Sequence, residues 1–315
     1  MYETTKPYIE KIEAIIRSTW DTKYLHVDVN GIYKKDRIYR YIIDFHHTDG
    51  IGTKGVDHWR ERTFHAAVQD ALAMNLNDFC LARAIPTAIC DHILIPEDDH
   101  EAIVQIVSFL AAECRMRDIA ITAGETAIHS NLKGLEISIT MSGFKRNLEP
   151  NQFHEGDILI GIESSGPHAN GFTKIHELFG DAMPRVLTAP TLVYFDYINK
   201  IDRVYGIHGM THITGGGFTK IKRFLGSYDA HIGRQHHLQP HAVFWDLLAK
   251  GVPEKELYRT FNCGIGFIIG VDYHVADACV SILKTQFNAA VIGNVISGTG
   301  KVHIASMFSG KAYIV

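Results

Sequence analysis

The order of apolar and polar residues predicts an N-terminal half in which helices and strands alternate. Isoleucines recur at helical spacing in 7–18, which predicts a first helix. Dense β-branched and aromatic residues in 37–46 predict a buried strand, and the Ala- and Leu-rich run 64–84 predicts a long buried helix that ends before Pro86. The half is completed by a strand at 87–95, a helix at 97–115 with acidic residues in its first turn, and strands at 118–122 and 135–144.

Apolar patterning stops at the acidic stretch 149–157 and starts again with a predicted strand at 157–164. We therefore expect two domains, at 1–150 and 151–315, in an α/β (α+β) fold. The second domain is expected to hold helices at 171–179 and 189–201, a Gly-rich turn at 214–217, and strands at 264–272 and 289–297. There is no repeat of fixed period, which excludes a solenoid.

Composition and charge exclude several classes of function. The chain has 315 residues, with 31 Lys plus Arg against 35 Asp plus Glu, so its formal net charge is −4 and it has no global positive field for nucleic acid or an anionic membrane. Apolar runs stay shorter than the about 18 residues of a membrane helix, and the first residues lack the pattern of a signal segment. We expect a soluble, cytoplasmic protein that binds neither nucleic acid nor membrane.

Cysteine and histidine spacing gives no sign of a structural metal. The five cysteines form no Cys-x-x-Cys pair and lie mostly among apolar neighbours, which favours reduced core residues. The 19 histidines are scattered, without a His-Glu-x-x-His motif or a Cys/His cluster at zinc spacing. We therefore expect no structural zinc.

A carboxylate, two glycines, a hydroxyl and a lysine follow the first predicted strand. Residues 47–54 read HTDGIGTK. Such a loop can direct backbone N–H groups, Lys54 and a metal-holding Asp49 toward phosphate oxygens. Asp-Gly is also a common turn pair, so an ordinary turn is the alternative.

Two further Gly-rich segments precede predicted or possible helices. Residues 166–173, GPHANGFT, have the spacing of a phosphate loop but carry Phe172 where the lysine belongs, so they are not a Walker loop. The helix N-terminus after them still offers N–H groups to an anion. Residues 214–217, TGGG, follow His212 and either admit a ligand close to the backbone or form a flexible turn.

Carboxylate side chains are the candidate metal ligands that would accompany these loops. Asp70 and Asp78 lie eight residues apart in the predicted helix, within about 80° of one another on one face. With Asp49 and Glu125 they could hold magnesium, which favours a few carboxylates together with substrate phosphates. In the alternative interpretation, Asp78 ends the helix and Asp70 faces solvent.

Taken in order, the segments HTDGIGTK, QDALAMNLND, AGETA, GDILIGIESSGPHANGFTKI, HITGGG and RTFNCGIGFIIGV resemble the aminoimidazole ribonucleotide synthetases, the phosphoribosylformylglycinamidine cyclo-ligases of purine synthesis. The resemblance begins at residue 47 and continues to the end of the chain. It implies an N-terminal α/β domain whose strands build a dimer barrel, a C-terminal α/β domain, and a nucleotide cleft between them. It also implies ATP and Mg²⁺ as cofactors, a small phosphorylated substrate and a homodimer. The same superfamily includes selenophosphate synthetase, thiamine-monophosphate kinase and a hydrogenase-maturation protein.

The resemblance assigns roles residue by residue. It implies catalytic roles for Lys54, Asp70 and His168, and metal binding by Asp49, Asp70 and Asp78. The cofactor-binding positions that it implies are Asp49, Gly50, Gly52, Thr53, Lys54, Asn77, Glu125, Thr126, Asn170, Thr214, Gly215, Gly216, Gly217 and Asn262. In the implied reaction ATP phosphorylates the amide oxygen of formylglycinamidine ribonucleotide, the amidine nitrogen attacks the activated carbon, and phosphate leaves as the imidazole ring closes. Such a reaction needs cation clamps on the phosphoryl group and a substrate held in one attack geometry.

Three segments depart from the family pattern. Residues 20–46 contain a single glycine where the family carries a Gly-rich loop, and residues 128–131 replace the Glu-Met-Pro-Gly that follows GETA in the family. Residues 219–223 replace a Glu-Asn and a Pro-Arg pair; their Lys220, Lys222 and Arg223 either supply the lost cation or form a solvated helix face. These changes motivate two alternatives: an ATP-dependent enzyme that acts on another small substrate, and a nucleotide-binding paralogue without turnover.

Overall fold

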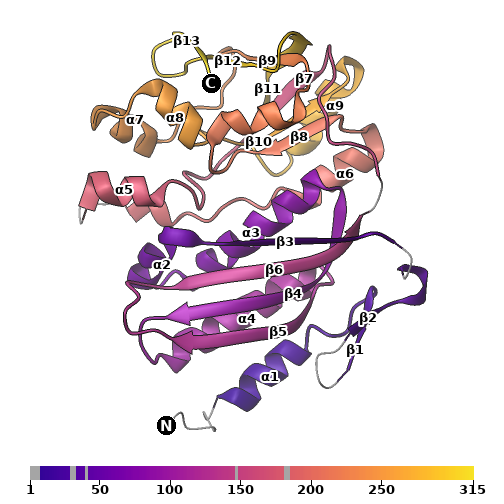
Figure 1. Ribbon diagram of the computed structural model, residues 1–315, viewed down its shortest axis with the longest axis vertical. Helices are drawn as coiled ribbons and strands as arrows, with labels where there is room; N and C mark the ends of the chain where they lie inside the picture. The colour runs from indigo at the N-terminus through magenta and orange to yellow at the C-terminus, as the bar shows by residue number, and fades with distance from the viewer. Residues whose placement is uncertain (1–7, 29–32, 40–41, 146–147, 181–184) are drawn as a thin grey trace. The chain divides into compact units, whose positions relative to one another are not determined.

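The computed structural model describes residues 8–28, 33–39, 42–145, 148–180 and 185–315 (Figure 1). The chain separates into two compact units, Met1–Asn147 and Leu148–Val315. The second unit begins one residue before the acidic stretch 149–157, at which the apolar pattern stops.

The first unit is built on a four-stranded sheet with the strand order β3-β6-β4-β5. Only β4 and β5 pair in parallel; β6 pairs antiparallel with both β3 and β4. The elements of this unit are α1 (Ile9–Arg17), β1 (Leu25–Val27), β2 (Tyr33–Lys35), the 3₁₀ turn η1 (Arg37–Tyr39), β3 (Asp44–Gly50), the 3₁₀ turn η2 (Gly52–Lys54), α2 (Gly55–Glu61), α3 (Phe64–Leu81), β4 (Ala84–Ile95), α4 (His100–Met116), β5 (Ala120–Ile128) and β6 (Glu136–Lys145).

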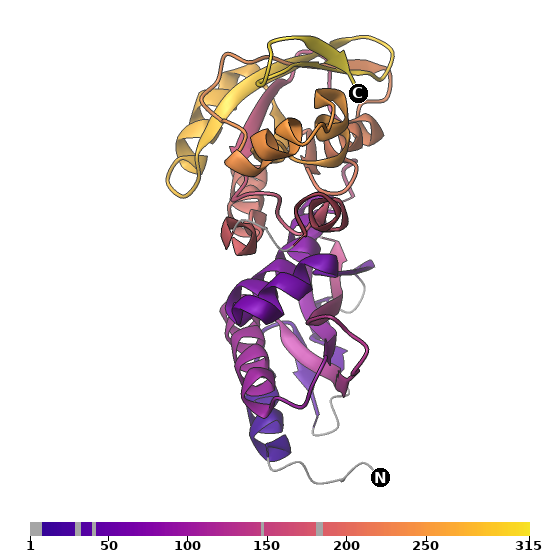
Figure 2. The ribbon, with the colours of Figure 1, turned by 90° about the vertical axis from the view of Figure 1, so that its left-hand side faces the viewer.

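Helices α3 and α4 form a second layer against this sheet, as Figure 2 shows in edge view. Most of α3 is buried, because it packs on β3, β4 and β6 and also against α4. The N-terminus of α4 is capped by Asp99, whose Oδ1 accepts a hydrogen bond from the Ala102 N–H at 2.9 Å. The predicted helices of this half are thus confirmed, with α3 ending at Leu81 because Arg83 adopts a positive φ of 49° and leads the chain into β4.

Two predicted strands of this unit have different bounds in the structure. Within the predicted strand 37–46, residues 37–39 form η1, and β3 begins only at Asp44 and runs through the HTDG segment. The apolar side chain of Ile38 is 74% exposed, so the β-branched character of this stretch does not reflect burial. β5 extends to Ile128 rather than ending at residue 122, because its parallel pairing with β4 continues to Ile95.

The second unit is built on a seven-stranded sheet with the order β13-β12-β9-β11-β7-β10-β8. All of its strand pairs are antiparallel except that of β12 with β9. Its elements are β7 (Ile158–Glu163), α5 (Phe172–Phe179), η4 (Arg185–Thr188), α6 (Phe195–Tyr205), β8 (Gly209–His212), the 3₁₀ segment η5 (Gly217–Phe224), β9 (Tyr228–Ile232), α7 (Ala242–Ala249), α8 (Glu254–Thr260), β10 (Ile265–Val271), η6 (Tyr273–Val275), α9 (Ala276–Leu283), β11 (Ala289–Ser297), β12 (Val302–Ala305) and β13 (Ala312–Ile314).

One face of this sheet forms the main hydrophobic core of the unit with α5, η5, α7 and α8. Ala230 and Ile232 of β9 and Val302 and Ile304 of β12 belong to that core. Since side chains alternate along a strand, the residues between them lie on the opposite face. The predicted strands 264–272 and 289–297 are confirmed as β10 and β11, whereas the helix predicted at 189–201 begins only at Phe195.

All five cysteines are free, as expected, and Cys90 alone among them is exposed, because it points away from the helix layer of the first unit. In the part of the chain that the structure describes, no helix is both long enough and apolar enough to span a membrane.

Candidate functional site

The HTDGIGTK segment forms the end of strand β3 and the turn into helix α2. Asp49 is half-buried near the end of β3, and its Oδ1 accepts a hydrogen bond from the Gly50 N–H at 2.7 Å. Gly52 and Thr53 follow in η2 and are exposed, whereas Lys54 is fully buried. The segment therefore presents a carboxylate, backbone and a hydroxyl to solvent, but it withdraws its lysine.

A polar cluster joins β3 to α3 beside Asp49. The His47 Nδ1 lies 2.9 Å from the Asn75 Oδ1, and the His47 Nε2 lies 3.1 Å from the Asp78 Oδ2. Asn75 also donates through Nδ2 to the Asp49 carbonyl at 3.2 Å. The hydrogen bond to Asp78 raises the pKa of His47. Asp49 and Asp78 thus flank one histidine at the junction of β3 and α3, with Asn77 buried in the neighbouring turn.

Lys54, His58 and Asp70 form a separate cluster with no exposed side-chain surface. The Asp70 Oδ2 lies 2.7 Å from both the Lys54 Nζ and the His58 Nε2, and the His58 Nδ1 lies 2.7 Å from the Thr63 Oγ1. Burial acts to raise the pKa of the Asp70 carboxyl, but the charge of Lys54 and the bond to His58 outweigh it and hold that pKa well below its usual range.

The structure gives Asp70 and Asp78 different partners, so α3 does not present them as the shared carboxylate pair expected from their spacing. Nor does Asp70 face solvent, as the alternative had it. The Asp70 side chain has no exposed surface that an ion could approach from solvent. In this structure the Asp70 carboxylate holds the Lys54 ammonium.

The register of the sheet separates Glu125 from Asp49. Asp49 of β3 pairs with Ile139 of β6, Ile139 pairs with Asp91 of β4, and Asp91 pairs with Gly124 of β5, which places these four residues in one row. Glu125 is the next residue along β5, so its exposed side chain points to the opposite face of the sheet, away from the helices. Thr126, half-buried, follows it. The structure does not bring Glu125 to Asp49, because the GETA segment is a strand rather than a loop.

Asp91 is a carboxylate that pattern reasoning missed. It lies in the same row as Asp49, and burial raises its pKa to about 7. A Cβ on Gly124 would lie 2.6 Å from the Asp91 Oδ2, so only glycine leaves room for this carboxylate. The signal available in the sequence was a single carboxylate inside the mainly apolar strand 87–95.

In the second unit, two asparagines join the predicted loops. The Asn170 Oδ1 accepts a hydrogen bond from the Gly215 N–H at 2.9 Å, which links the GPHANGFT loop to the TGGG turn. The Asn262 Oδ1 accepts from the Ser164 Oγ at 2.9 Å, and its Nδ2 donates to the Gly166 carbonyl at 2.8 Å. Three segments far apart in the sequence therefore form one polar site.

The TGGG turn exposes its backbone beside a lysine. Gly215 and Gly216 are exposed, and the half-buried Lys220 donates from Nζ to the buried Thr214 Oγ1. A Cβ on Gly217 would lie 2.3 Å from the Tyr258 carbonyl, and its φ is 51°, so this turn requires glycine there. Lys222, by contrast, is exposed, as is the following arginine.

His168 lies beneath this site rather than on its surface. It is fully buried with a φ of 60°, and its Nε2 is 3.4 Å from the Ser165 N and 3.5 Å from the Tyr194 Oη. The rings of Tyr194 and His212 lie 6.1 and 6.0 Å from the His168 ring, centroid to centroid. His168 therefore lies beneath the loop that carries Asn170 and supports this loop.

Comparisons with known proteins agree with this two-unit arrangement. Residues 42–144 match the family model described as AIR synthase related protein, N-terminal domain, and residues 154–305 match the one described as its C-terminal domain. A phosphoribosylformylglycinamidine cyclo-ligase of Saccharolobus solfataricus is 30% identical over 307 residues, which cover 95% of this chain and 92% of that protein. One from Pyrococcus horikoshii is 31% identical over 273 residues, which cover 82% and 80%.

Solved structures of other activities share the fold. Hydrogenase maturation protein HypE in complex with ATP superimposes with a TM-score of 0.71 at 16% identity, covering 99% of this chain and 95% of that one. Thiamine-monophosphate kinase from Stenotrophomonas maltophilia superimposes with a TM-score of 0.68 at 18% identity, covering 98% of both chains. The two family models and the relatives that align over most of their length show that the chain belongs to the AIR synthase related protein family.

Proposed function

We propose that the protein is an ATP- and magnesium-dependent cyclo-ligase that closes formylglycinamidine ribonucleotide to aminoimidazole ribonucleotide. The observation that carries this proposal is the site in the second unit, where the side chains of Asn170 and Asn262 hold the SGPHANG, TGGG and FNCG segments together. The relatives named as cyclo-ligases that align over most of this chain support the choice of reaction.

The first unit fits magnesium at Asp49 and Asp78. Both are partly exposed carboxylates at the junction of β3 and α3, and oxygen is the ligand type that magnesium prefers. The His47 Nε2 contacts the Oδ2 of Asp78 and so fixes the orientation of this carboxylate at the junction of β3 and α3. Magnesium and ATP together would supply the transferable phosphoryl group and neutralise its charge. We assign Lys54 and Asp70 to the support of the turn that carries Asp49, since both are buried in one ion pair.

The second unit fits the phosphate of a substrate. The exposed Gly216 adjoins the Lys220 side chain, and an anion can accept hydrogen bonds from a backbone N–H and from an ammonium group. Asn170 holds the N–H of Gly215 and so fixes the turn. Holding the substrate in one orientation is the main contribution that such a site makes to ring closure.

A second candidate function is an ATP-dependent reaction on another small substrate. Two observations favour it: Glu125 lies on the exposed face of its strand, and residues 129–131 after it are exposed in a sequence unlike that of the cyclo-ligases. HypE and thiamine-monophosphate kinase have this fold, so the fold alone does not choose among ATP-dependent reactions. A nucleotide-binding paralogue without turnover is the third possibility.

The test is a coupled assay of ADP release with magnesium-ATP, with and without formylglycinamidine ribonucleotide, together with detection of aminoimidazole ribonucleotide. The cyclo-ligase predicts product in equal amount to ADP. ADP release that does not depend on this substrate points to the second function, and nucleotide binding without ADP release points to the third. Light scattering of the purified protein tests the proposed homodimer.

Lys220 and Lys222 provide a matched pair of variants for the same assay. Lys220→Met should raise the KM for the phosphorylated substrate at least tenfold, because it removes the cation beside the TGGG turn. Lys222→Met removes the same charge from an exposed position two residues away and should leave the KM unchanged. Equal effects of the two variants would mean that the site responds only to net charge.

A further inference from the structure

Three potential metal ligands meet on the face of β9 and β12 that lies opposite the main hydrophobic core of the second unit. His303 of β12 pairs directly with His231 of β9 in parallel register, so both imidazoles point to the same side. Asp229 lies two residues before His231 on β9 and therefore shares that side. Ala230 and Ile232 point the other way, into the hydrophobic core. The strand register alone thus holds two imidazoles and a carboxylate in adjacent positions.

The three side chains are close enough to share one ion. One ligand atom from each can be chosen so that all lie within 4.8 Å of one another. The His303 Nε2 is 3.0 Å from the Asp229 Oδ2, and the two imidazole rings stack with their centroids 4.3 Å apart. A tetrahedral zinc with ligand bonds of about 2.0–2.1 Å separates its ligand atoms by about 3.3 Å. To bind one ion, the two rings must rotate out of this stack, because the nitrogen lone pairs of stacked rings lie in nearly parallel planes.

The surroundings hold Asp229 ready for this role. Its Oδ1 accepts hydrogen bonds from the backbone N–H groups of Thr299 and Lys301, at 2.7 and 2.8 Å. Those bonds secure the connection between β11 and β12 and leave Oδ2 to His303.

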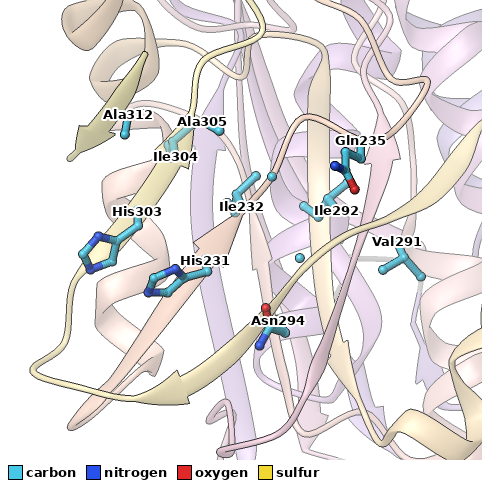
Figure 3. A pocket seen from close by; sticks show the side chains of 12 residues that line it. His231, Ile232, Gln235, Val291, Ile292, Asn294, His303, Ile304, Ala305 and Ala312 are labelled. Carbon is cyan, nitrogen blue, oxygen red and sulfur yellow. The ribbon is translucent and has the colours of Figure 1, made fainter. Parts of the chain in front are cut away.

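A pocket adjoins the two histidines (Figure 3). Its volume is about 580 Å³, and Gln235, Val291 and Asn294 line it together with His231 and His303. Figure 3 shows the two rings side by side on neighbouring strands, with Asn294 on the next strand. Asn294 pairs with His231 in the sheet. An ion bound by the three side chains would therefore have space beside it for water or for a small ligand.

We propose that Asp229, His231 and His303 form a binding site for a divalent transition-metal ion, with zinc as its best match. Imidazole ligands select zinc, nickel or copper over magnesium, so this site is chemically distinct from the carboxylates of the first unit. Three protein ligands leave a fourth position open to water or an exogenous ligand. The site is independent of the proposed function, and neither depends on the other.

The chain supplies an internal control for this proposal. His154, Asp157 and His208 form a second group with ligand atoms within 4.8 Å of one another, also in the second unit. Its His154 is exposed, and both oxygens of its Asp157 are bonded, by His208 at 2.6 Å and by the His154 N–H at 2.8 Å. Variants of this group therefore remove two histidines and leave the proposed site intact.

The experiment is a calorimetric titration of the full-length, chelator-treated protein with zinc chloride, repeated with cobalt to follow its visible absorption. We expect one tight equivalent of zinc that excess magnesium does not displace. The double variant His231→Gln/His303→Gln should abolish this binding, since it removes both imidazoles. Glutamine at 303 still offers Asp229 a donor, and circular dichroism checks that the fold is kept. Asp229→Asn should weaken binding by about 100-fold or more, because it removes a direct carboxylate ligand, and the loss of even a supporting carboxylate costs about 10- to 100-fold at other metal sites.

His154→Gln/His208→Gln should bind zinc as the unmodified protein does. Three results would overturn the proposal: no tight zinc binding, zinc binding that survives His231→Gln/His303→Gln in a folded protein, or zinc binding lost in the control variant instead. Cobalt spectra without the bands of a tetrahedral nitrogen and oxygen site would also count against it.

Discussion

Asp91 carries a carboxyl group that opposes folding at neutral pH. It lies in β4 within the row that also contains Asp49, and burial raises its pKa to about 7. In the unfolded chain an aspartate has a pKa of about 3.9. Replacement by asparagine keeps the shape of the side chain and removes its ionisation, so the comparison of the two proteins isolates this one proton.

The magnitude follows from the two pKa values. The folded state holds the proton more tightly, so the free energy of unfolding falls as pH rises through the window from about 4 to about 7. At pH 8 the full difference of about 3 units corresponds to about 4 kcal/mol. From pH 5 to pH 8 the advantage of Asp91→Asn over the unmodified protein should grow by about 2.5 kcal/mol, whatever constant cost the buried amide adds.

Urea unfolding between pH 5 and pH 8 measures this change. Trp20 and Trp59 lie in the first unit, and Trp245 lies in the second. A Trp245→Phe background therefore makes tryptophan fluorescence report on the unit that contains Asp91. Trp20 is a suitable probe, because its Nε1 donates to the Ile121 carbonyl of β5 at 2.7 Å.

A difference between the two proteins that stays constant from pH 5 to pH 8 would refute the reasoning, because it would mean that Asp91 titrates alike in both states. A difference that grows as expected would show that the chain retains a carboxylate at a cost in stability. Retention of such a group is typical of residues that serve a ligand. Asp91→Asn should then also reduce the rise in Tm that magnesium-ATP produces.

Three further substitutions test the site. Lys54→Met leaves Asp70 buried without the Lys54 cation and should lower the free energy of unfolding of the first unit, measured in urea, by about 3–5 kcal/mol. Unchanged stability together with lost ADP release would instead mean that Lys54 binds the ATP phosphates. Asn262→Ala should lower the stability of the second unit by about 1–3 kcal/mol and raise the KM for substrate, because three hydrogen bonds of the loops are lost. An unchanged KM would show that these loops do not contribute to the substrate site. Asp49→Asn should reduce turnover about 100-fold or more with an unchanged urea midpoint, and normal turnover would remove Asp49 from the magnesium ligands.

Helices, strands and turns that depend on local patterns could be predicted from the sequence. The spacing of apolar residues located α3, α4, β10 and β11, and the Gly-rich segments located the turns of the second unit. Asn170 and Asn262 were named through the resemblance to the cyclo-ligases, and the structure brings their segments together. Such features depend on neighbours within a few residues, and the chain order records those neighbours directly.

Pairing between distant segments decided the rest. Strand register turned Glu125 away from Asp49 and placed Asp91 in its row, and packing of α3 on the sheet buried Asp70 with Lys54. His231 and His303 are 72 residues apart, outside any zinc spacing, and meet only because β9 and β12 lie side by side. The sequence by itself determined which groups are present and the local element that carries each; only the tertiary structure decided which groups meet, because side-chain direction and burial depend on contacts between segments that the chain order does not record.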